Sequence, residues 1–112
     1  MTKPSPDLDV LQQRLASAWS IRTNSQWSAD NPARGQCSVT ALAVHLLFGG
    51  DILKTRTAGG MHFYNRIGGE TRDFTAAQFE SPPSYDDLPS NADEALADTS
   101  AAQLEALMQA LR

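Results

Sequence analysis

The chain contains a single cysteine, Cys37, and two histidines, and these residues decide what chemistry it can attempt. Cys37 stands at the start of an apolar run, just after the turn-forming residues Pro32 and Gly35. If this run is a helix, free N–H groups and the positive end of the helix dipole lie beside the sulfur and stabilise a thiolate. Such a thiolate is suited to attack a carbonyl carbon, provided that a base stands beside it and a third group holds that base.

The two histidines compete for the role of base. His45 lies about two helical turns beyond Cys37 in the same predicted helix, roughly 12 Å along the axis, which is too far for a hydrogen bond. His62 falls at the start of a predicted strand, from which long-range packing can bring it to the helix end. We therefore predict that His62 is the base and that His45 is a surface or hydrogen-bonded helix residue.

The group that would orient the base is predicted from hairpin geometry. Gly68–Gly69 separates two strand-like segments and is typical of a two-residue hairpin loop. In that register Tyr64 faces Asp73, so His62 and Asp73 are diagonal neighbours on one face of the hairpin. A four-residue loop would move the two apart, and a three-residue loop would place them on different faces. Asn65 is the rival orienting residue, but this register points it to the opposite face.

A Cys37–His62–Asp73 triad also needs donors for the oxyanion that forms on the attacked carbonyl. The backbone N–H of Cys37 is one candidate. The other oxyanion or substrate-binding candidates are unranked amide and indole side chains: Gln36, Asn31, Trp27 and Asn65. No metal or other cofactor is predicted, because no CxxC or HxxxH spacing of a zinc motif is present.

Apolar spacing and turn residues predict the elements that must position these groups. Runs at helical spacing predict three helices, beginning near Asp7, at Ser38 and at Ser100, and the second ends at Gly49–Gly50. Three strands are expected over residues 51–57, 61–67 and 70–75. Residues 1–6 are predicted to be a loose polar lead. Residues 80–98 are expected to be an acidic, Pro/Ser-rich surface loop with at most one helical turn. This order indicates a single α+β domain, residues 1–112, with helices on one side of a small antiparallel sheet.

Composition excludes several classes of function. The net charge of −4 and nine scattered Lys and Arg residues argue against a nucleic-acid partner, which needs a clustered basic surface. The apolar segments are too short to span a bilayer, and the N-terminus lacks the apolar core of a signal peptide. One cysteine allows no internal disulfide, which suits a reducing compartment, so we expect a cytoplasmic protein.

The motifs around these residues resemble a known pattern. The stretch "NPARGQCSVTALAVHLLFGGDIL" followed by "HFYNRIGGETRDFTAAQF" is similar to the small bacterial YunG-like proteins. The resemblance covers roughly residues 27–79 and depends on G-Q-C, G-G, H-x-x-N and D-x-T-x-x-Q-F elements. More broadly, a cysteine at a helix N-terminus with histidine and aspartate on successive strands looks like the papain-like and transglutaminase-like superfamily.

That superfamily resemblance implies a small papain-like fold and thiol acyl chemistry at an amide, peptide or isopeptide carbonyl. The chain departs from the papain signature, since Ser38 and Val39 follow Cys37 where that signature has a second cysteine and an aromatic residue. It is also shorter than most full proteases of the group and has no obvious second lobe. These departures favour a small amide or a flexible peptide end as substrate, rather than a folded protein.

Two other classes of function remain open. The same groove can serve a non-catalytic module that binds a peptide or small ligand. The last predicted helix can also present an apolar face to a protein partner or a second copy. That face consists of Leu104, Leu107, Met108 and Leu111.

Overall fold

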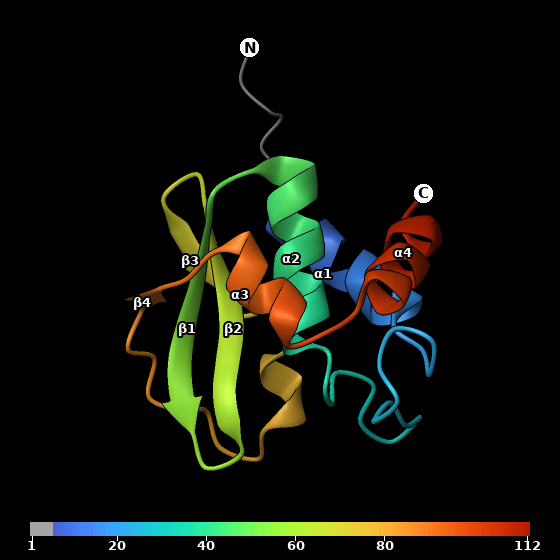
Figure 1. Cartoon of the computed structure of the whole chain (residues 1–112), viewed down its shortest axis with the longest axis horizontal. Coiled ribbons are helices and arrows are strands. Elements are labelled where there is room, and N and C mark those ends of the chain that lie inside the picture. The colour runs from blue at the N-terminus through green and yellow to red at the C-terminus, as the bar shows by residue number, and fades with distance from the viewer. Residues whose placement is uncertain (1–5) are drawn as a thin grey trace.

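The computed structural model describes residues 6–112 (Figure 1). The prediction of a loose lead at residues 1–6 therefore lies outside the described residues, except for residue 6. The elements, in chain order, are α1 (Leu8–Ala18), α2 (Cys37–Phe48), β1 (Asp51–Thr57), β2 (Gly60–Ile67), β3 (Glu70–Arg72), the 3₁₀ helix η1 (Ala76–Gln78), β4 (Leu88–Pro89), α3 (Ala92–Ala97) and α4 (Ala101–Ala110). No helix within residues 6–112 is long and apolar enough to cross a bilayer.

The strands form one antiparallel sheet in the order β3-β2-β1-β4. Ile67 pairs with Glu70, so the predicted two-residue hairpin loop is confirmed. β3 is shorter than expected because the chain leaves the sheet at Asp73. There the Asp73 carboxylate accepts hydrogen bonds from the backbone N–H and the hydroxyl of Thr75. The predicted α+β class is confirmed.

Helix α2 is central because its sequence is apolar on nearly every side. One core packs between α2, α1 and α4 and includes Leu15, Val39 and Leu107, each fully buried. A second core joins α2 to the sheet and α3 through Phe63 and Ala95. The α-helices gather on one side of the sheet (Figure 1), and the N-terminal end of α2 points toward η1.

Residues 80–98 contain more structure than their composition suggested, and the prediction of at most one helical turn is wrong. Pro89 pairs at the sheet edge next to β1, a position where its missing N–H is tolerated. The side chain of Asn91 then caps α3 by accepting from the N–H of Glu94. Ala95 is fully buried against α2, so tertiary packing stabilises a helix in an otherwise polar segment.

The apolar face of α4 is used within the chain. Leu107 and Leu111 are buried in the main core, and Leu104 and Met108 pack against it. Because these four side chains contact α1 and α2 neighbours, the face offers little free area to a partner or a second copy.

We expect Gly50→Ala to destabilise the protein by about 1–3 kcal/mol. Gly50 has a φ of 74°, and a Cβ there would overlap the backbone carbonyl oxygen of Arg66, which the β1–β2 pairing holds in place. Urea unfolding would measure the loss. The matched control is Gly59→Ala, because a Cβ at Gly59 meets only the Thr57 hydroxyl at 3.9 Å. Equal stability of the two variants would contradict this account of the turn.

Candidate active site

His62 and Asp73 form the buried centre of the candidate site. His62 lies on β2, and Asp73 directly follows β3. His62 Nε2–H donates to Asp73 Oδ2 over 2.7 Å, and the two side chains are 3% and 7% exposed. Phe79 packs edge-on against the imidazole with ring centroids 4.8 Å apart, which restricts the ring further. The hairpin therefore brings together the residues that the sequence predicted as base and orienting acid.

The surroundings of His62 raise its pKa from 6.5 to about 9. Burial is the largest influence and acts in the opposite direction, but hydrogen bonds and charges from Asp73 and Cys37 together outweigh it. For Asp73, burial raises the pKa, while contacts from His62, Tyr85 and Thr75 lower it below its ordinary value. At pH 7 the pair is therefore an imidazolium hydrogen-bonded to a carboxylate.

The thiol of Cys37 lies on the other side of the imidazole. Its interaction with His62 is one of the contacts that raise the histidine pKa. Because Asp73 occupies Nε2, Nδ1 is the ring nitrogen left for the sulfur. The imidazole thus has both the thiol and the carboxylate as neighbours.

The N-terminus of α2 differs from those of the other α-helices. Side chains of Asp7, Asn91 and Ser100 cap α1, α3 and α4, whereas Gln36 makes no side-chain cap bond to α2. The first backbone N–H groups of α2, including that of Cys37, therefore receive no side-chain acceptor from the capping residue. They are directed at the end of the helix where the sulfur lies.

Tyr85 is a member of the site that sequence reasoning missed. Its hydroxyl donates to Asp73 Oδ2 over 2.7 Å, the same oxygen that accepts from His62. Burial and this bond raise the pKa of Tyr85 above its ordinary value, so the phenol stays a donor at neutral pH. With Thr75 on Oδ1, both carboxylate oxygens are held. An aromatic residue within an acidic, proline-rich segment was the only signal that the sequence offered.

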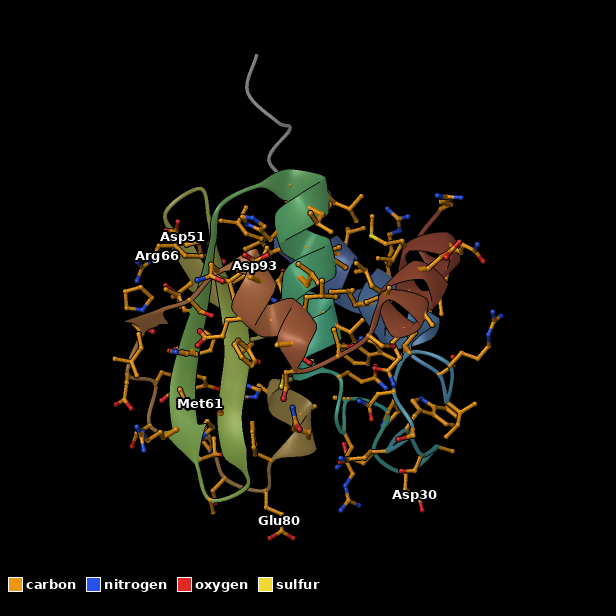
Figure 2. The ribbon with its side chains drawn as sticks, in the orientation of Figure 1. Asp30, Asp51, Met61, Arg66, Glu80 and Asp93 are labelled. Atoms are coloured by element: carbon orange, nitrogen blue, oxygen red, sulfur yellow. The ribbon has the colours of Figure 1, made fainter. Side chains whose placement is uncertain are left out.

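A groove of about 770 Å³ opens beside Cys37 and His62. Its walls come from five segments: the loop before α2, the β1–β2 turn, the end of η1, the chain that follows it, and Asp98 at the end of α3. Figure 2 places Met61, one of the lining residues, near the turn that joins β1 to β2. The half-buried Cys37 side chain can therefore be approached from one side by a small or extended molecule, and His62 lines the same groove although its ring is almost fully buried.

Comparison with known proteins identifies the family. Residues 7–112 match the sequence model of a family described as YunG protein. The chain belongs to the YunG family. The uncharacterized protein YunG of Bacillus subtilis (strain 168) is 44% identical over 96 residues, which cover 86% of this chain and 84% of that protein. No solved structure matches the chain at a significant level. The predicted YunG-like resemblance is thus confirmed.

The side chains proposed as oxyanion or substrate contacts do not line the groove of this YunG-family chain. Gln36 is fully buried: its Oε1 accepts from the Thr23 hydroxyl, and its Nε2 has no partner within residues 6–112. Trp27 packs against the main core. Asn31 donates to the Gln78 carbonyl and Asn65 to the Ala41 carbonyl.

Other amides occupy the groove of the YunG-family chain instead. Asn24, Gln26 and Gln78 line it together with the catalytic candidates. Gln78 belongs to the D-x-T-x-x-Q-F element, which was the only sequence signal for any of the three. His45 lies elsewhere, with Nδ1 2.9 Å from the Gly50 carbonyl oxygen, as expected for a hydrogen-bonded helix residue. Within residues 6–112, no group of three or more His, Cys, Asp or Glu side chains is arranged to hold a metal ion.

Proposed function

We propose that this YunG-family protein is a cysteine-dependent hydrolase or acyltransferase acting on an amide, peptide or isopeptide carbonyl. The observation that carries the proposal is the buried 2.7 Å bond between His62 and Asp73, with the Cys37 thiol as the other partner of the imidazole. A charge pair that served only the core would have no need to open onto a groove beside the chain's one cysteine. An imidazolium in this position balances a thiolate and can give a proton to a leaving amine.

The reaction follows in two steps. The Cys37 thiolate attacks the carbonyl carbon, and the tetrahedral intermediate collapses as a C–S bond replaces the C–N bond. His62 gives its Nδ1 proton to the departing amine and becomes neutral. Water, or an acceptor amine, then attacks the thioester carbonyl. His62 accepts a proton from this nucleophile, and the Cys37 thiolate leaves. Asp73 stays ionised throughout and fixes the ring so that Nδ1 faces the sulfur.

The oxyanion is expected to sit at the N-terminus of α2. The backbone N–H of Cys37 is available there, because Gln36 supplies no side-chain cap. The amides of Asn24 and Gln26, which line the groove, are candidates for the second donor, whereas Gln78 Nε2 already donates to the carbonyl and hydroxyl oxygens of Thr75. Gln36 itself is fully buried and would need to turn outward to contribute.

The proposal extends to architecture and compartment. A nucleophile at the start of a central helix, packed on an antiparallel sheet that carries the histidine, supports a minimal papain-like arrangement. A reactive lone thiol also favours a reducing compartment, and we propose the cytoplasm. The open groove suits a small amide or a flexible peptide end better than a folded protein.

The test is formation of an acyl-enzyme. Incubation with 4-nitrophenyl acetate, followed by mass spectrometry of peptides, is expected to show acetylation of Cys37 and continued release of nitrophenol. Cys37→Ser should abolish the adduct at this position, and His62→Gln should slow both its formation and its hydrolysis. If Cys37 of the folded protein is acetylated no faster than Cys37 of the urea-unfolded chain, the enzyme proposal is wrong, and a binding module that uses the same groove is favoured.

A further inference from the structure

Positively charged side chains outnumber carboxylates among the residues that line the groove. Arg34 and Arg56 line it, and Asp98 is the one carboxylate among its lining residues within 6–112. The His62 imidazolium is balanced by Asp73, so the comparison rests on the two arginines and the one lining carboxylate. The groove therefore has an excess of cationic side chains over carboxylates, although the chain as a whole has a net charge of −4.

Neither groove arginine is committed to a partner in the fold. Other cations are used structurally: Lys54 pairs with Glu94, Arg66 with Asp87, and Arg72 with Asp9. Arg34 and Arg56 form no ion pair within residues 6–112, and both are exposed. Their guanidinium groups remain available to a ligand that enters the groove.

The two arginines line the groove from different walls. Arg34 stands three residues before Cys37, in the loop that leads into α2. Arg56 lies on β1 opposite Met61, the residue that precedes His62. A substrate in the groove thus meets one arginine on the wall that leads into α2 and another on the wall formed by the β1–β2 hairpin.

The rest of the lining is mainly polar and neutral. It presents amides and hydroxyls, including those of Asn24, Gln26, Ser81 and Ser84, whereas large apolar contacts are few. Such a surface suits a polar molecule that exchanges hydrogen bonds with amides, and it offers little to a long alkyl chain.

We infer that the substrate carries a carboxylate close to the reacting carbonyl, and that Arg34 and Arg56 recognise it. A free peptide C-terminus and an acidic side chain next to an amide both have this chemistry. The guanidinium group binds a carboxylate through two parallel N–H bonds, so each arginine can supply orientation as well as charge. This inference rests on the proposed acyl chemistry at Cys37.

Matched acyl donors test the inference. The first pair is the 4-nitrophenyl ester of glutaric acid, with one free carboxylate, and that of pentanoic acid. The second pair is the acetyl ester of a hydroxynitrobenzoic acid and the acetyl ester of nitrophenol. In the first of these two esters the carboxylate is on the leaving phenol instead of on the acyl group. In at least one pair, the rate of Cys37 acylation at limiting donor is expected to be tenfold or more higher for the anionic donor. The readout is this ratio within a pair, which cancels differences in folding between variants.

Variants then assign the preference. Arg34→Gln and Arg56→Gln should each lower the ratio, and the double variant should bring it near one. Arg22→Gln is the control, because Arg22 is exposed but lies outside the groove, and it should keep the ratio. If both donors of each pair acylate Cys37 equally, or if the double variant keeps the preference, the inference is overturned while the acyl chemistry stands. If no donor acylates Cys37, the proposed function fails, and this inference fails with it.

Discussion

His62→Gln is expected to slow the alkylation of Cys37 by iodoacetamide at pH 7 by about 10- to 30-fold. Thiolate, rather than thiol, is the reacting species, and an ordinary cysteine is only a few per cent ionised at this pH. The pKa of His62 is raised to about 9, so its imidazolium is present at pH 7 to balance a thiolate. Glutamine keeps a hydrogen-bonding side chain but not the positive charge.

The pH dependence of alkylation separates this effect from a change in access. Above about pH 10 the imidazolium is lost in the wild type and an ordinary thiol ionises unaided, so the two rates should converge. A variant that merely blocked or opened the groove would differ from the wild type by the same factor at every pH. A constant factor across pH 6–10 would therefore contradict the charge pair.

Controls for this experiment come from the chain itself. His45→Gln removes the other histidine, which contacts the Gly50 carbonyl, and should leave the rate unchanged. Asp73→Asn should resemble His62→Gln, because burial lowers the histidine pKa once the carboxylate no longer opposes it. Asp93→Asn replaces an exposed aspartate on α3 and should behave as the wild type.

The central pair of the site was predictable because a short hairpin fixes side-chain parity. Gly68 and Gly69 both adopt positive φ, of 58° and 83°, which glycine tolerates and a two-residue loop requires. Given that loop, the alternation of side chains along β2 places His62 on the side from which Asp73 approaches. The approach of Cys37 was also favoured by sequence, since a run apolar on all sides had to become the central helix.

The remaining contacts depend on the path of a loop, which local sequence does not determine. Tyr85 reaches Asp73 because neighbouring residues are fixed by tertiary bonds: the Ser84 carbonyl accepts from Thr55, and Asp87 accepts from Tyr64. Asp87 adopts a φ of 53°, a conformation that favours glycine and that no sequence signal marked.

Local sequence also failed to indicate which amide side chains line the groove. Gln36 adjoins Cys37 in the chain, but proximity in sequence says nothing about side-chain direction. The hydroxyl of Thr23 donates to Gln36 Oε1 and turns this amide into the protein. Gln78, distant in sequence, lines the groove because η1 folds back beside β2.

Thermodynamic stability should report the His62–Asp73 bond independently of any reaction. We expect the free energy of unfolding of a Cys37→Ser protein to fall as pH rises above 6.5, over a narrower range than in the wild type, because part of the increase in the His62 pKa to about 9 comes from Cys37. The serine background is used because a cysteine thiol ionises in the same range and would add its own proton uptake. Above pH 6.5 the folded state, in which Asp73 is still bonded to His62, keeps the His62 proton that the unfolded chain has lost, so rising pH favours unfolding.

The size and the limits of this dependence follow from the two pKa shifts. The contribution is fully present below pH 6.5 and is lost as the pH rises through the folded-state pKa of His62, which is about 9 when Cys37 is present and lower without it. The whole wild-type shift corresponds to roughly 3 kcal/mol, so the serine protein should show less than this. Asp73 is ionised in both states over this window and adds no slope. Its own contribution, from a pKa lowered below 3.8, is present above that value and is lost as the solution is acidified further.

Adding Asp73→Asn to the serine background should abolish the slope between pH 6.5 and 9. Burial would then dominate at His62 and keep the imidazole neutral in the folded state over the whole window. Asp93→Asn in the same background is the matched control and should retain the slope. Urea unfolding at half-unit pH intervals measures all three proteins. A slope that survives Asp73→Asn would mean that another group holds the histidine proton, and the orienting role of Asp73 would have to be abandoned.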